Sequence, residues 1–230
     1  MIVTDRFVFL HLHKSGGTFV NECLLRFVGG AHRVGYHLPR AMIPARYAAL
    51  PALGMVRSPW SYYVSWYAFQ SQQQQGNALF RIASADRTLD FRGTIGNLLE
   101  LGGNDHRLDA LVRQLPGTYT GGGLNVPGPV IERIRGSNLG FYSFLHDHIY
   151  GGPGALHVGR LEHLRADLLR LLAAVSQPVS AEMRSYIESA GSRNSSAHDH
   201  YTDYYDDSLR TRVAQRDALV IEKYGYRFGD

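Results

Sequence analysis

The chain has 230 residues, a length that one α/β domain can occupy, with 44% hydrophobic and 19% charged residues. This composition is that of an ordinary globular protein and gives no reason to invoke disorder. The formal net charge of +4 suits an anionic ligand but is too small and too dispersed to indicate nucleic-acid binding. Cys23 is the only cysteine, which excludes an intrachain disulfide and a four-cysteine zinc site.

The first residues show no pattern typical of a secretory signal, and nowhere do about 18 apolar residues run together as a membrane span requires. We therefore expect no membrane span and a cytoplasmic location. No repeat and no long linker divides the sequence, which predicts a single domain over residues 1–230. Nothing in the sequence indicates an oligomeric state.

The chain opens with a strand, a turn and a helix. Residues 6–12 are short, apolar and rich in aromatic and branched side chains, as in a buried strand. The turn at 13–18 contains two glycines. From Phe19 to Val28 the apolar residues recur on one helical face. This order is typical of the start of a β-α-β unit.

The same alternation continues through the chain. A second buried strand is predicted at 53–56, and Ser58-Pro59 directly after Arg57 is typical of a helix N-cap followed by the first helical residue. These elements predict an α/β fold of three layers, with a central parallel sheet flanked by helices. The other expected elements are a strand at 155–158 and helices at 107–115, 141–149, 161–175 and 206–223.

The glycine turn is a place that can hold phosphate, because backbone N–H groups converge there and the helix dipole favours an anion. In the loop of nucleotide triphosphatases the lysine follows the glycines. Here Lys14 precedes Gly16 and Gly17, so that pattern fails. Taken alone, the turn is a weak signal that is better explained as a tight connection with a solvated lysine.

A second candidate phosphate site follows the second strand. Arg57 ends this strand, and Ser65 lies seven residues beyond Ser58, on the same face of the next helix. An arginine can bind phosphate through two N–H groups, and open α/β sheets bind ligands beyond the carboxyl ends of their strands. Two such sites predict a nucleotide with phosphates at both ends of its ribose. Arg57 alone would be explained as well by a surface ion pair.

These segments resemble sulfotransferases that use 3′-phosphoadenosine 5′-phosphosulfate (PAPS). HLHKSGGTF at 11–19 is similar to their 5′-phosphosulfate loop and VRSPWSYYVSWY at 56–67 to their 3′-phosphate motif. Residues 158–172, 193–209 and 223–228 are similar to later family segments, in the expected order. The most similar subgroup is the carbohydrate sulfotransferases of the heparan 2-O and HNK-1 types. The resemblance implies the P-loop-like sulfotransferase fold and transfer of a sulfuryl group from PAPS to a hydroxyl of a glycan, lipid or small-molecule acceptor, with release of 3′,5′-phosphoadenosine (PAP).

The resemblance also implies roles for single residues. Lys14 would hold the bridging oxygen of the phosphosulfate, where negative charge develops as the S–O bond breaks. Arg57 and Ser65 would hold the 3′-phosphate, and Arg193 with Ser195 would close over the nucleotide. The residues that would donate backbone or hydroxyl groups to the 5′-phosphate are Ser15, Gly16, Gly17, Thr18 and Phe19.

An acceptor hydroxyl needs a base, because a protonated alcohol is a poor nucleophile, and histidine titrates near neutrality. His37 stands about where the 2-O-sulfating enzymes carry a histidine of this role, and we predict it as the base. The alternatives are His32, Glu22 on the first helix, or no single base. The chain departs from the family at Tyr62, where an arginine is frequent, which puts one 3′-phosphate contact or one helix ion pair in doubt.

Two other functions remain open at this point. A kinase on the same fold class would use ATP with Mg²⁺ and needs a lysine after the glycines. A non-catalytic nucleotide-binding protein would bind PAP without transfer. The His11/His13 pair and two similar pairs lack a third and fourth ligand at a recognisable spacing, so no metal site or metal requirement is predicted. Residues 70–155 carry no motif that identifies the acceptor.

Overall fold

The computed structural model of the chain describes residues 1–191 and 199–230. The chain divides into two compact units, Met1–Arg57 with Asp147–Ser195 and Ser58–His146 with Ser196–Asp230. Within the described ranges, every helix is too short or too polar to cross a bilayer.

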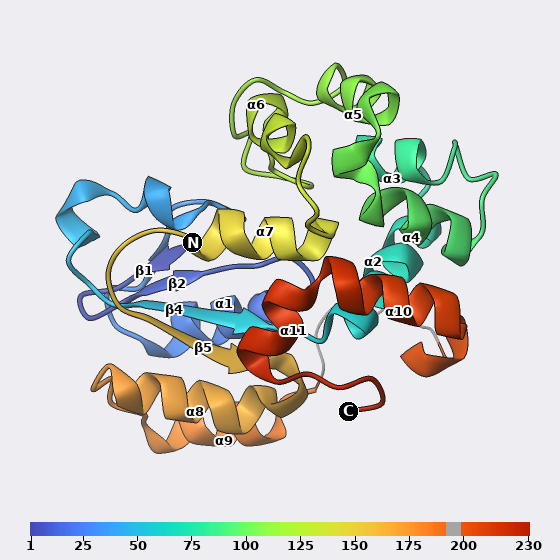
Figure 1. The fold of residues 1–230 in the computed structure, drawn as a ribbon. Helices are drawn as coiled ribbons and strands as arrows, with labels where there is room; N and C mark the ends of the chain where they lie inside the picture. Colours follow the sequence, from blue (N-terminus) through green and yellow to red (C-terminus); the bar gives the residue numbers. More distant parts are fainter. Residues whose placement is uncertain (192–198) are drawn as a thin grey trace. The chain divides into compact units, whose positions relative to one another are not determined.

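A five-stranded sheet forms the centre of the first unit, in the order β3-β1-β2-β4-β5 (Figure 1). The strands β2 (Val8–Leu10), β4 (Ala52–Val56) and β5 (Leu156–Arg160) are parallel. β1 (Ile2–Val3) runs antiparallel to β2 and to β3 (His32–Arg33). The predicted parallel sheet is therefore confirmed for β2, β4 and β5, and two further strands of two residues each, β1 and β3, extend it beyond β2.

Helices cover both faces of this sheet. A Cβ at Gly159 would meet the side chains of Asp167 and Leu171, so this face lies against α8 (Leu164–Ala174). A Cβ at Gly54 would meet the ring of Tyr150, at the end of α7 (Phe141–Tyr150), on the opposite face. The Tyr150 hydroxyl donates to the Met55 carbonyl at 2.8 Å and accepts from its N–H at 3.0 Å. The predicted three layers are confirmed.

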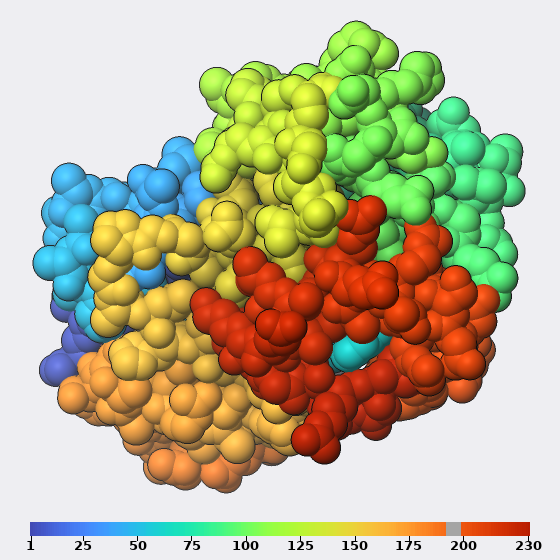
Figure 2. All heavy atoms as spheres, viewed as in Figure 1, coloured from blue at the N-terminus to red at the C-terminus, as the bar shows by residue number. Residues whose placement is uncertain are grey.

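One apolar core joins the sheet to α1 (Gly17–Phe27), α8 and α9 (Ala181–Ser189). The helices α8 and α9 lie side by side in Figure 1, and Figure 2 shows their orange atoms together at the surface. The expected helix at 161–175 begins only at Leu164, after the 3₁₀ turn η5 (Leu161–His163). Members of this core include Phe7, Phe9, Val20, Leu24, Leu53, Met55, Leu168 and Leu171.

The second unit is helical, and Pro59 begins its first helix as predicted. The Ser58 side chain does not cap that helix. The prediction of a single helix at 206–223 is wrong, because the helix is interrupted at Asp217. The buried Asp217 carboxylate accepts hydrogen bonds from the Tyr63 hydroxyl (2.8 Å) and the Ser143 N–H (2.7 Å). The helices of this unit, besides the first part of α7, are α2 (Pro59–Gln72), α3 (Ala78–Ala83), α4 (Phe91–Leu99), α5 (Asp105–Val112), α6 (Gly128–Ile131), α10 (Asp207–Arg216) and α11 (Ala218–Tyr224).

Candidate active site

The loop from β2 to α1 turns sharply at the carboxyl edge of the sheet. Lys14 (φ 55°) and Gly16 (φ 79°) both have left-handed backbones, a conformation that glycine adopts without strain. Gly16 is the N-cap of α1, and among the described residues no side chain caps this helix. The first turn also contains no acidic residue. The positive end of the helix dipole is thus left for an anion.

Gly17, the first residue of α1, lies so close to the His11 ring that no side chain would fit between them. A Cβ at this position would come within 2.0 Å of Cδ2 of His11. The His11 ring is buried, and its Nδ1 lies 3.1 Å from Nδ2 of Asn21, one turn further along α1. The Ser15 hydroxyl donates to the His13 carbonyl at 3.1 Å, so it stabilises the turn itself. Its backbone N–H remains the predicted phosphate donor.

Lys14 and Arg57 follow two neighbouring parallel strands and are close together. Nη1 of Arg57 donates to the backbone carbonyl of Lys14 at 3.4 Å. Burial, and secondarily the charge of Arg57, lower the pKa of Lys14 to about 8. An anion bound here would favour the protonated ammonium. The structure therefore brings together the two cations that the sequence places in separate phosphate sites.

His37 is held against the loop from β2 to α1 by a hydrogen bond to His11 and by ring contacts with His11 and His13. Its Nδ1 lies 2.9 Å from the carbonyl oxygen of His11. Because a carbonyl only accepts, Nδ1 carries the proton and Nε2 the lone pair. Ring centroids are 3.6 Å apart for His13 and His37, with 14° between planes, and 4.4 Å apart for His11 and His37. Burial lowers the pKa of His37 to about 4, although the hydrogen bond to His11 opposes this shift.

The other candidate bases make different contacts. Glu22 is exposed on α1 and accepts from the Tyr186 hydroxyl at 3.2 Å. His32 is exposed in β3, and its Nδ1 donates to the Gly30 carbonyl at 3.0 Å. Of the three, His37 is the residue whose ring contacts the phosphate loop.

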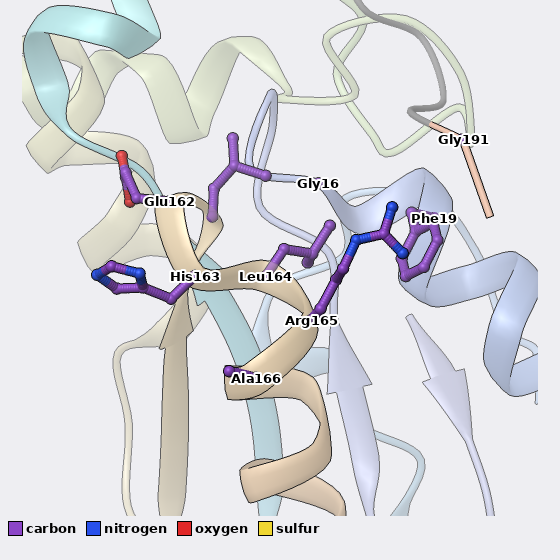
Figure 3. Close-up of a pocket in the computed structure, with 9 residues that line it drawn as sticks. Gly16, Phe19, Glu162, His163, Leu164, Arg165, Ala166 and Gly191 are labelled. Atoms are coloured by element: carbon purple, nitrogen blue, oxygen red, sulfur yellow. The ribbon is translucent and has the colours of Figure 1, made fainter. Parts of the chain in front are cut away.

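A cavity of about 460 Å³ begins at Gly16 and extends between α1 and the turn from β5 to α8. Its walls are Phe19, residues 161–166 and Gly191. Figure 3 shows Arg165 and Phe19 facing one another, and the guanidinium carbon lies 5.7 Å from the ring centroid. The same guanidinium donates to the carbonyls of two residues at the end of α9, Ile187 and Ala190. The volume is within the range of small-molecule sites.

The remaining predicted site residues belong to the second unit or fall outside the described residues. Ser65 is buried on α2, in the second unit. Tyr62 is fully buried in that unit and stacks on Tyr142 with centroids 4.0 Å apart. Arg193 and Ser195 lie outside the described residues. Among the described residues, no three His, Cys, Asp or Glu side chains are grouped as metal ligands.

Sequence reasoning did not find two parts of this site. His11 and His13 are recognisable as an HxH pair, but only the structure shows that both rings contact His37. The cavity walls from Leu161 to Arg165 lie in a segment that resembles the family, without a motif that marks them as a wall.

No protein-family model matches the chain, and no curated protein matches its sequence. A solved structure of mouse sulfotransferase SULT7A1 complexed with PAP is similar, with a TM-score of 0.50 and 12% identity. The match covers 98% of this chain and 86% of that chain. At this identity the similarity concerns the fold, and the P-loop-like sulfotransferase fold predicted from the sequence is confirmed.

Proposed function

We propose that the chain is a PAPS-dependent O-sulfotransferase that acts on an acceptor hydroxyl, and that residues 1–230 function as one such domain. One observation carries the proposal. Lys14, the N-terminus of α1 and Arg57 meet at the carboxyl edge of β2 and β4, and His37 is held against the same loop. Binding of PAP by the similar mouse enzyme supports this choice of donor. A cytoplasmic location remains a prediction from the sequence.

The residues present fit a doubly phosphorylated nucleotide. The backbone N–H groups of residues 15–19 would receive the 5′-phosphate at the start of α1. The cavity that begins at Gly16 would take the nucleoside. Arg57 would hold the 3′-phosphate through two N–H groups. The contributions of Ser65, Arg193 and Ser195 stay predictions from the resemblance.

The chemistry would be an in-line displacement at sulfur. His37 Nε2 would accept the acceptor's proton while the hydroxyl oxygen forms a bond to sulfur. The bond from sulfur to the bridging oxygen breaks, and its electron pair stays on the 5′-phosphate. The Lys14 ammonium and the N–H groups of α1 would stabilise this charge. The products are a sulfate ester, PAP and a proton on Nε2, and no step requires a metal.

The direct test is transfer from PAPS labelled in its sulfuryl group. The protein would be incubated with phenols, sugars, alkyl alcohols and water as acceptors, in the presence of EDTA. We expect label in a sulfate ester, or in free sulfate when water is the acceptor. PAP binding without any transfer would support a non-catalytic nucleotide-binding protein instead. Mg²⁺-dependent use of ATP would support the kinase.

The pH dependence of kcat/KM for PAPS should be bell-shaped, with an acid limb set by His37 and an alkaline limb set by Lys14. His37 must be neutral, so activity rises through about pH 4, and Lys14 must be protonated, so activity falls through about pH 8. Lys14→Arg should abolish the alkaline limb, because arginine stays protonated. An acid limb near the ordinary histidine value of about 6.5 would contradict the assignment of His37.

A further inference from the structure

The His13 ring stacks directly on the ring of His37, the proposed base. The rings of His13 and His37 are almost parallel, with centroids 3.6 Å apart. His13 is buried and immediately precedes Lys14. His37 itself has a left-handed backbone (φ 49°), which is unfavourable for a residue other than glycine. The contacts of its ring must therefore hold it in place.

The hydrogen bond and the stack restrict different motions of the His37 ring. The bond from Nδ1–H to the His11 carbonyl fixes one atom and selects the tautomer, but the ring could still turn about that bond. The parallel face of His13 fixes the ring plane. Together they allow one direction for the lone pair on Nε2, which a proton transfer needs.

The stack would also matter after proton transfer. With a proton on Nε2, the His37 ring is a cation that lies over the π face of His13. Where water is largely excluded, a contact with an aromatic face stabilises a cation by about 1–2 kcal/mol, which corresponds to about 5- to 30-fold. This stabilisation would be present in the transition state, in which the proton is partly transferred, and absent in the ground state, in which the ring is neutral.

We propose that His13 is a positioning residue, which orients His37 Nε2 towards the acceptor hydroxyl and stabilises the imidazolium through its ring face. This inference rests on the proposed function of His37. His13 is not itself assigned a proton transfer. The titratable and charged groups around His37 are His11, His13, Tyr36, the amino group of Met1 and Arg33, which lies over the Tyr36 ring.

Two substitutions at one position separate the possible roles of His13. His13→Phe keeps an aromatic face but cannot carry a proton, and its kcat should stay within about threefold of the native value. His13→Ala removes the face, and its kcat should fall by about 5- to 30-fold, as the cation–π energy predicts. PAP affinity should be unchanged in both variants. The acid limb of the pH profile should move downward only in His13→Ala, because the protonated His37 ring then loses the face that stabilises it.

An NMR measurement that needs no turnover tests this inference independently of the proposed function. Side-chain ¹⁵N NMR should show the Nδ1–H tautomer of His37 in the native protein and in both variants, because the His11 carbonyl selects it, and a lowered His37 pKa only in His13→Ala. A His37 pKa that is unchanged in His13→Ala would overturn the role of the His13 ring face, even if no acceptor is ever found. A loss of turnover in His13→Phe as large as that of a His37 variant would also overturn it, because His13 would then carry the proton.

Discussion

Lys14→Ala is expected to lower turnover by about a thousandfold, one of the two largest effects expected of a single substitution. Removal of one fixed donor to a developing negative charge lowers kcat by about 10²–10³, and an ammonium group acts more strongly than a neutral donor. The effect on PAP affinity should be smaller, because the N–H groups of α1 and Arg57 remain. Turnover would be measured with labelled PAPS and the best acceptor, or with water.

The control for this change is Lys223→Ala. Lys223 is the only other lysine in the sequence and lies on α11, in the second unit. This variant should keep native turnover. Lys14→Arg should recover part of the lost activity, because the charge is retained with a different shape. Near-native turnover of Lys14→Ala would contradict the electrostatic role of this residue.

His37→Gln is expected to lower turnover by about 10²–10⁴, the usual contribution of a general base. Glutamine can still donate to the His11 carbonyl, so the loop should keep its conformation and PAP affinity should be unchanged. His32→Gln and Glu22→Gln are matched controls, since both residues are exposed and were alternative bases. A loss of turnover in one of these variants, with native turnover in His37→Gln, would move the base to that residue.

The elements that carry the phosphate site were predictable because strong local signals mark them. β2, the glycine turn and α1 follow from an apolar run, two glycines and a helical apolar face. β4, Arg57 and α2 follow from a short apolar run and a proline at the helix start. β1 and β3 were missed because two residues are too few to show a period.

Contacts between distant residues could not be predicted from local patterns. His37 reaches His11 across 26 positions, and its left-handed backbone carries no sequence signal in a histidine. The break at Asp217 was missed for a similar reason, because its partners Tyr63 and Ser143 are far away in the sequence. A carboxylate in a helical pattern predicts a solvated face until its partners are known.

The tyrosine at position 62, where the sulfotransferases that the sequence resembles often carry an arginine, has a local explanation. This side chain is fully buried against Tyr142, in a core that also holds Tyr63 and Asp217. An arginine in this place would need a charged partner to offset its desolvation, and the nearby Asp217 carboxylate already accepts from the Tyr63 hydroxyl and the Ser143 N–H. The tyrosine is therefore consistent with the packing around it, and Arg57 is the remaining predicted arginine of the 3′-phosphate motif.

The most direct measurement is isothermal titration of the protein with PAP, ADP and ATP. The account predicts that PAP binds at least about tenfold more tightly than ADP, because only PAP has a 3′-phosphate for the charged hydrogen bonds of Arg57. Arg57→Gln should remove this preference, whereas Arg46→Gln, at an exposed arginine of the same unit, should not. Equal affinity for PAP and ADP, or tighter binding of ATP, would contradict a nucleotide held by both of its phosphate groups.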